Sequence, residues 1–277
     1  MTRLLRPTAP GRLGALHRAR GNFRRAEPLL RAAVALAEES DRQDGLELAA
    51  ALNELGLLCK DIARYDEAHA LYERALRLLE RRSADAHHIA ALYHNLGGIE
   101  HARGNHAAGE TFARRGLALR RSIAGCDHRD IAADLAALAA LLDAQGKYEE
   151  AESLYVEALC ILEQDPLANA GEIAVALNGL GALHTLRGEL DRATELLERA
   201  TTLKRSALGA GHPGLAVTLN NLAVTWRKRG DLARASALYA ESARILERSL
   251  GADHPGTIIC RSNAAHCDSM QLVSTTP

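Results

Sequence analysis

A leucine recurs almost every 42 residues along this chain of 277 residues. A fixed period of this length indicates an array of structural repeats, in which each repeat packs on its neighbours rather than around one common centre. The leucines, which we call the anchors, are Leu13, Leu55, Leu96, Leu138, Leu180 and Leu222. The spacing therefore predicts a repeat protein.

The composition favours helical repeats, and the net charge argues against two classes of partner. Apolar residues make up 47% of the chain but aromatic residues only 3%, which favours closely packed helices over a β-sandwich. The formal net charge of −1 creates no overall field that would attract nucleic acid or an anionic membrane. No apolar run approaches the roughly 20 residues that a membrane-spanning helix needs.

The cysteines and the first residues indicate a cytoplasmic protein. There are five cysteines, an odd number, and no CxxC motif, which is typical of reduced thiols rather than a disulfide framework. The segment MTRLLRPTAPGR has no apolar core of the kind found in a secretory signal. We therefore expect a cytoplasmic location.

Small and large residues occupy fixed positions after each anchor. Small residues follow at plus 1 and plus 13, where two helices can approach closely, and a larger residue at plus 17 would fill the remaining gap. A glycine stands at plus 8 in five of the six repeats, where a left-handed residue would end a helix. Each repeat is thus predicted to be an antiparallel pair of helices that must stack on the next pair.

These repeats resemble the tetratricopeptide repeat. The clearest copies are LAALAALLDAQGKYEEAESLYVEALCILE (135–163) and LNNLAVTWRKRGDLARASALYAESARILE (219–247). The usual period of that family is about 34 residues. The longer period, with LGAGHP (208–213) and LGADHP (250–255) between repeats, resembles the kinesin-light-chain subclass, and His212 and His254 are expected to help start the helices that follow.

The resemblance implies an all-α, right-handed solenoid of about six helix-turn-helix repeats and one C-terminal helix. It spans residues 11–268, including a final half repeat at 255–268. We expect residues 1–10 to form a flexible segment and residues 269–277 a disordered tail. The helical pairs are expected near 46–62 and 65–82, 87–103 and 106–122, 129–145 and 148–164, 171–187 and 190–206, and 213–229 and 232–249.

The third repeat is predicted to have the lowest local stability in the array. Its second helix contains Gly109 and Gly116, each costing about 1 kcal/mol relative to alanine in a helix interior. Amide hydrogen exchange should therefore be fastest across residues 106–122.

The resemblance also implies where a partner would bind. In this family the first helix of each repeat lines the concave surface, and positions −5, −2, +2 and +5 relative to the anchor share one stripe of that helix. Asparagine recurs at −2, and its amide can pair with the backbone of an extended peptide through both a donor and an acceptor. The candidate peptide-binding residues are Asn53, Lys60, His94, Asn95, His101, Asp143, Asn178, Thr185, Asn220, Asn221, Arg227 and Lys228.

Two alternative interpretations of these positions stay open. The asparagines could instead bridge neighbouring helices, and the charged residues could be ordinary solvated groups. Some members of the family hold a C-terminal carboxylate with basic residues at −5 and −1, but here −5 is occupied by Ala50, Ala91, Ala133, Val175 and Val217. That clamp is therefore not expected.

Neither a metal site nor a catalytic motif is predicted. His87, His94 and His101 are spaced seven residues apart, a step of about 10.5 Å along a helix, so they cannot share one zinc ion. His101 and His106 flank a turn and could approach each other, but no second pair of ligands accompanies them. No nucleophile elbow, phosphate-binding loop or HExxH motif occurs, so no cofactor and no enzyme activity are expected.

These features favour a scaffold that binds a protein or peptide partner in a concave groove. Neither nucleic acid nor a membrane is expected as a partner, and the oligomeric state stays open. One alternative is a regulatory or sensor part of a larger signalling protein that carries an ATPase or kinase. A second alternative is a metal-binding protein or an enzyme built on the solenoid.

Overall fold

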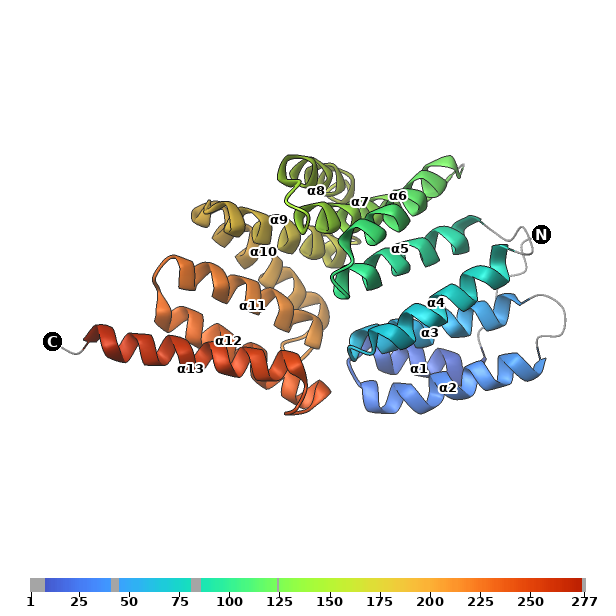
Figure 1. Cartoon of the computed structure of the whole chain (residues 1–277), viewed down its shortest axis with the longest axis horizontal. Coiled ribbons are helices and arrows are strands. Elements are labelled where there is room, and N and C mark those ends of the chain that lie inside the picture. Colours follow the sequence, from blue (N-terminus) through green and yellow to red (C-terminus); the bar gives the residue numbers. More distant parts are fainter. Residues whose placement is uncertain (1–7, 41–44, 81–85, 124, 276–277) are drawn as a thin grey trace. The chain divides into compact units, whose positions relative to one another are not determined.

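The computed structural model describes residues 8–40, 45–80, 86–123 and 125–275 (Figure 1). Within these ranges there are thirteen α-helices and no strand, and the chain divides into two compact units, residues 1–147 and 148–277. The first unit contains α1 (Ala9–Ala19), α2 (Phe23–Ser40), α3 (Leu46–Asp61), α4 (Tyr65–Glu80), α5 (Ala86–Ala102), α6 (His106–Ser122) and α7 (His128–Asp143). The second contains α8 (Tyr148–Leu162), α9 (Ala170–Arg187), α10 (Leu190–Leu208), α11 (Pro213–Lys228), α12 (Leu232–Leu250) and α13 (Pro255–Thr275).

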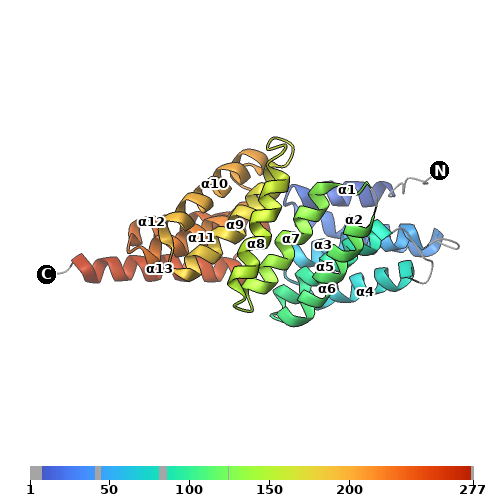
Figure 2. The ribbon, with the colours of Figure 1, turned by 90° about the horizontal axis from the view of Figure 1, so that it is seen from above.

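Consecutive helices pack on one another within each unit. In the first unit α1 packs on α2, α3 on α4 and α5 on α6, and each pair also contacts the first helix of the next pair. In the second unit α9 pairs with α10 and α11 with α12, and α11, α12 and α13 lie side by side in both views (Figures 1 and 2). This is the helix-pair packing of a tetratricopeptide solenoid, and it confirms the all-α prediction.

The small residue after each anchor allows a large side chain from the partner helix to enter. A β-carbon placed on Gly56 of α3 would lie 2.5 Å from Cε1 of Tyr72 on α4, closer than atoms can approach. The same relation holds between Gly181 of α9 and Leu197 of α10, with a distance of 2.7 Å to Cγ. Tyr72 and Leu197 are both fully buried, so the predicted pairing of plus 1 with plus 17 is confirmed.

The anchors themselves form the core between the paired helices. Leu55, Leu96, Leu138, Leu180 and Leu222 are all buried. Leu13 is the exception, with 45% of its surface exposed. Its helix, α1, packs on α2 and α3.

Local capping explains where several helices begin. The Nδ1 atoms of His212 and His254 accept hydrogen bonds from the backbone amides of Gly214 and Gly256, over 3.0 and 3.1 Å. Each histidine stands before the proline that begins α11 or α13, where the missing proline N–H needs no partner. The predicted role of these two histidines is confirmed.

Two predicted boundaries were wrong. Ala9 and Pro10, expected in a flexible segment, belong to α1, because the Thr8 hydroxyl accepts a hydrogen bond from the Gly11 amide and caps the helix. At the other end α13 continues to Thr275 rather than ending at residue 268, since no glycine or proline interrupts residues 257–275. The other parts of those two segments, residues 1–7 and 276–277, lie outside the described residues.

The second helix of the third repeat, α6, has its glycines at close contacts. A β-carbon on Gly109 would lie 2.5 Å from Cδ2 of Leu141 on α7, and one on Gly116 would lie 3.1 Å from Cβ of Tyr93 on α5. The glycines therefore let α6 approach both neighbours. The expected rapid hydrogen exchange across 106–122 stays a prediction.

None of the described helices combines the length and hydropathy that a membrane-spanning segment requires.

Candidate functional site

All twelve candidate residues lie on the first helices of the repeats, as predicted from the spacing. In the first unit, α3 carries Asn53 and Lys60, α5 carries His94, Asn95 and His101, and α7 carries Asp143. In the second unit, α9 carries Asn178 and Thr185, and α11 carries Asn220, Asn221, Arg227 and Lys228.

Asparagines bridge neighbouring first helices in both units. Nδ2 of Asn95 donates a hydrogen bond to Oδ1 of Asn53 over 2.7 Å, and Nδ2 of Asn221 donates one to Oδ1 of Asn178 over 3.1 Å. The bridging interpretation is therefore confirmed for these four residues. Each amide has two donor hydrogens and two acceptor lone pairs, so one bridge leaves capacity for a bound backbone at Asn53, Asn178 and Asn221, whereas Asn95 is buried.

His94 belongs to an ionic network between α5, α6 and α7. Its Nδ1 lies 2.8 Å from Oδ1 of Asp134, whose other oxygen accepts a hydrogen bond of 2.6 Å from Nε of Arg120. Burial lowers the pKa of Arg120, but its hydrogen bond and charge pair with Asp134 outweigh this effect and raise it. The network holds His94 in place, so a peptide can reach only the remaining edge of its ring.

Asp134 and Arg120 were missed by the sequence analysis. Asp134 stands four residues before the anchor Leu138, where the other five repeats carry Ala9, Ala51, Leu92, Ala176 and Thr218. The sequence feature that could have identified Asp134 is a carboxylate at a position that is apolar or uncharged in the other repeats. Both side chains are buried, as the pairing of opposite charges allows.

Polar groups with unused hydrogen-bonding capacity gather near the ends of α3 and α5. The rings of His101 and His106 lie 5.1 Å apart between centroids, so the expected approach of these two residues is confirmed. Their Nδ1 atoms are buried and have no hydrogen-bond partner among the described residues. Burial, followed by the nearby His106 and Lys60, lowers the pKa of His101. A buried imidazole nitrogen in such a position can form a hydrogen bond to a ligand.

Lys60 and Asp143 have the same position, plus 5, on α3 and α7. A β-carbon on Gly98 of α5 would lie 2.9 Å from Nζ of Lys60, so this side chain extends over the neighbouring first helix. Burial lowers the pKa of Lys60 and raises the pKa of Asp143. Oδ1 of Asp143 is buried without a hydrogen-bond partner among the described residues.

The polar candidates of the second unit differ in exposure. Thr185 is buried, and its hydroxyl bonds the Gly181 carbonyl and lies 2.7 Å from the Thr225 hydroxyl. These contacts occupy the hydroxyl inside the α9–α11 contact, so its prediction as a surface contact was wrong. Nζ of Lys228 donates a hydrogen bond to the Thr185 carbonyl over 2.9 Å, and both Arg227 and Lys228 are exposed.

An exposed apolar line in the second unit was also missed. Val175 of α9, Val217 of α11 and Ile259 of α13 are 54%, 55% and 55% exposed, although branched apolar residues favour burial. They stand five residues before Leu180, Leu222 and the equivalent Ala264. The sequence feature that could have identified these residues is a branched side chain at a position that holds alanine in the second, third and fourth repeats.

An apolar cavity lies between α1, α2 and α3 of the first unit. Its volume is about 270 Å³, and its lining includes Ala15, Ala33 and Ala50 together with Glu47 and Glu54. This volume can accept a single aliphatic side chain, and charged groups of both signs stand beside it, since Arg12 lines the cavity together with the two glutamates.

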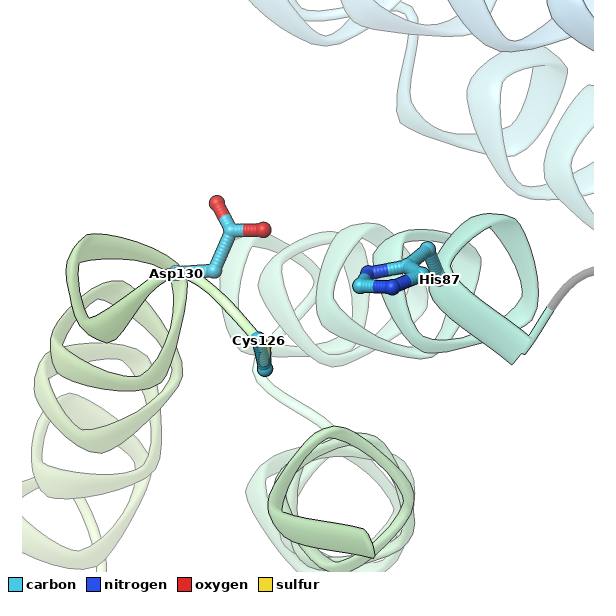
Figure 3. A group of neighbouring side chains, drawn as sticks. All are labelled: His87, Cys126 and Asp130. Carbon is cyan, nitrogen blue, oxygen red and sulfur yellow. The ribbon is translucent and has the colours of Figure 1, made fainter. Parts of the chain in front are cut away.

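The three histidines spaced seven residues apart have different neighbours. His94 pairs with Asp134 and His101 with His106, whereas His87 lies beside Cys126 and Asp130 (Figure 3). One potential ligand atom from each of these last three residues lies within 4.8 Å of the other two.

The repeat signature extends over most of the chain. The family model described as tetratricopeptide repeat matches residues 5–81, 88–164 and 172–248. The chain belongs to the tetratricopeptide repeat family. No curated protein matches the sequence.

Several solved structures are similar in fold. NprR in complex with its cognate peptide NprX has a TM-score of 0.70 and 15% identity, with 100% of this chain and 80% of that chain covered. BtubC (BKLC) from P. vanneervenii has a TM-score of 0.56 and 23% identity, covering 87% and 94%. A protein from Podosopora anserina described as a kinesin light chain with nearly identical TPR-like repeats has a TM-score of 0.51 and 18% identity, covering 75% and 98%.

Proposed function

We propose that this protein is a non-catalytic scaffold that binds an extended peptide segment of a protein partner along the first helices of its repeats. The observation that carries the proposal is the pairing of an apolar and an amide position on α9 and again on α11. Val175 and Asn178 are three residues apart on α9, and Val217 and Asn220 repeat that arrangement 42 residues later. Residues three apart on a helix lie on one face.

The chemistry of these positions suits an extended peptide. The valines would cover apolar side chains of the peptide, and burial of such surface contributes about 25 cal/mol per Å². The asparagine amides would hydrogen-bond its backbone without selecting a side chain. Exposed Arg227 favours a carboxylate nearby. We therefore expect the second unit to prefer peptides that combine apolar and acidic residues.

The first unit would contribute polar contacts and one apolar cavity. His101 and Asp143 have buried polar atoms without a hydrogen-bond partner among the described residues, and the cavity beside Ala50 can take an aliphatic side chain. The likeness in fold to NprR, whose structure was solved in complex with its cognate peptide, supports the proposal. With a net charge of −1, nucleic acid is not an expected partner, and a cytoplasmic location remains part of the proposal.

The test begins with selection of peptides from a displayed random library by the full chain, followed by dissociation constants from fluorescence anisotropy. The double substitution Val175→Asp/Val217→Asp should weaken binding of a selected peptide at least about tenfold, because an unpaired carboxylate would be buried under it. Val156→Asp is the matched control, since Val156 is 43% exposed on α8, a second helix of a repeat.

The asparagines form the second arm of the test. Asn178→Ala/Asn220→Ala should weaken the same peptide about five- to tenfold, the effect of losing one or two hydrogen bonds. Circular dichroism melts must show that each variant is folded. Equal affinity for the wild type and both double variants would overturn the proposal.

A further inference from the structure

His87, Cys126 and Asp130 come together from three separate elements of the first unit. His87 lies in the first turn of α5, Cys126 in the connection between α6 and α7, and Asp130 in the first turn of α7 (Figure 3). An imidazole nitrogen, the thiol sulfur and a carboxylate oxygen all lie within 4.8 Å of one another. Since Cys126 follows His87 by 39 residues, the group is a product of tertiary packing.

We propose that these three side chains form a binding site for one divalent transition-metal ion of the zinc type. Zinc takes imidazole nitrogen, thiolate sulfur and carboxylate oxygen at about 2.0–2.3 Å, usually in a tetrahedral arrangement. Ligand atoms around such an ion stand roughly 3.5 Å apart, so side-chain rotations that bring the three atoms about 1 Å closer complete the site. A thiolate and an imidazole disfavour the hard ions Mg²⁺ and Ca²⁺.

Charge and proton balance are consistent with a doubly charged ion. Binding would convert the Cys126 thiol to a thiolate and release its proton to solvent, so thiolate and Asp130 carboxylate together neutralise the ion. Sγ of Cys126 contacts the Asp127 carbonyl over 3.6 Å, a weak contact that metal binding would replace. Three protein ligands leave a fourth position for water.

Arg120 positions the carboxylate of this site. Its Nη1 donates a hydrogen bond to Oδ2 of Asp130 over 2.8 Å, while its Nε is held by buried Asp134 over 2.6 Å. This hydrogen bond engages one of the two carboxylate oxygens of Asp130. Groups that hydrogen-bond a metal ligand in this way fix its orientation, although the positive charge of Arg120 also limits the affinity.

The ion would join the beginnings of α5 and α7 through the α6–α7 connection. The ion would therefore connect the third repeat to the fourth. The second helix of the third repeat, α6, is the helix that carries Gly109 and Gly116. Metal binding at ligands from separate elements stabilises the folded state, because the unfolded chain does not hold them together. The site would thus be a structural metal site that stabilises the packing of the third repeat on the fourth.

The first measurement titrates Co²⁺, a spectroscopic substitute for Zn²⁺, into the metal-free full chain. We expect one ion per chain, a thiolate-to-cobalt charge-transfer band and the intense visible bands of four-coordinate cobalt, with Zn²⁺ displacing Co²⁺. Cys126→Ser should abolish the charge-transfer band, and His87→Ala should weaken binding at least about tenfold. Cys160→Ser, which removes an exposed cysteine of α8, is the matched control and should bind like the wild type.

The second measurement separates metal binding from folding. In chelator the melting temperatures of wild type and Cys126→Ser should agree, whereas Zn²⁺ at a hundredfold excess over Kd should raise that of the wild type alone, by roughly 5 °C. The proposal is overturned if wild-type protein gives no charge-transfer band, or if Cys126→Ser retains it. An equal rise in melting temperature for both proteins would also contradict it.

Discussion

The side-chain amide of Asn221 on α11 donates a hydrogen bond to the side-chain oxygen of Asn178 on α9, over 3.1 Å. The two residues are 43 positions apart, one at −1 and the other at −2 relative to its anchor. The same bond joins Asn95 to Asn53 in the first unit. The asparagines therefore connect successive repeats, and the bridge in the second unit also orients Asn178, one of the two amides that we propose a peptide meets.

This bridge predicts a measurable coupling between repeats. Asn221→Ala and Asn178→Ala should each lower the free energy of unfolding by about 1 kcal/mol, the usual net contribution of one hydrogen bond. The double variant should lose less than the sum, with a coupling of about 0.5–1 kcal/mol. Urea unfolding followed by circular dichroism measures all three. Strict additivity would show that the bridge contributes nothing in solution.

The contact between Gly56 and Tyr72 predicts strong intolerance to a single methyl group. Gly56→Ala places a β-carbon 2.5 Å from a buried ring and should destabilise the protein by about 2 kcal/mol, since a packed core has no room for it. Gly171→Ala is the control, because no atom lies within 4 Å of its β-carbon position in α9. That variant should be neutral or slightly stabilising. Thermal melts that rank the two variants in the reverse order would contradict this packing.

Ala63 predicts a stabilising substitution. It ends α3 with φ of 61°, a left-handed conformation that the equivalent Gly146 and Gly188 adopt at their helix ends. An alanine there costs about 1–2 kcal/mol, partly offset by the greater freedom of glycine in the unfolded chain. Ala63→Gly should therefore stabilise the protein by about 0.5–1 kcal/mol, whereas Gly146→Ala should destabilise it. Chemical denaturation of both variants measures the sign, and a loss of stability in Ala63→Gly would refute the argument.

Lys204 predicts an unusual dependence of stability on pH. Its buried ammonium donates one hydrogen bond, to the Gly214 carbonyl over 3.1 Å, and burial lowers its pKa to about 8 from the ordinary 10.5. Between these values the unfolded chain binds more protons than the folded chain, so the free energy of unfolding should rise as the pH increases from 8 to 10.5.

The matching variant is Lys204→Met, which keeps the length of the side chain and removes its charge. At pH 7 it should be more stable than the wild type by on the order of 1–3 kcal/mol, and this gain should shrink above pH 8. Denaturant unfolding at several pH values measures both effects. An unchanged difference between the two proteins from pH 7 to pH 10.5 would exclude titration of Lys204 as the cause.

Helix positions and the pairing of small with large residues could be predicted because both follow from short-range rules. The expected helix at 213–229 corresponds to α11 at Pro213–Lys228, since proline begins it and the repeat period places its end. The candidate site was predicted only as a set of helix positions. Whether Thr185 is buried or Val217 exposed depends on which neighbouring side chains cover each position, and local periodicity does not contain that information.

The 42-residue period by itself determined that this chain forms helical pairs, that the pairs stack, and which faces of the helices meet, because an anchor and its small neighbours specify packing within one repeat. Only the tertiary structure decided the polar partners: Asn95 with Asn53, Asp134 with Arg120 and His94, and Cys126 with His87 and Asp130. These contacts join residues from different helices, many of them a repeat apart. They form only where the packing of whole helices brings side chains of compatible charge and hydrogen-bonding capacity into reach.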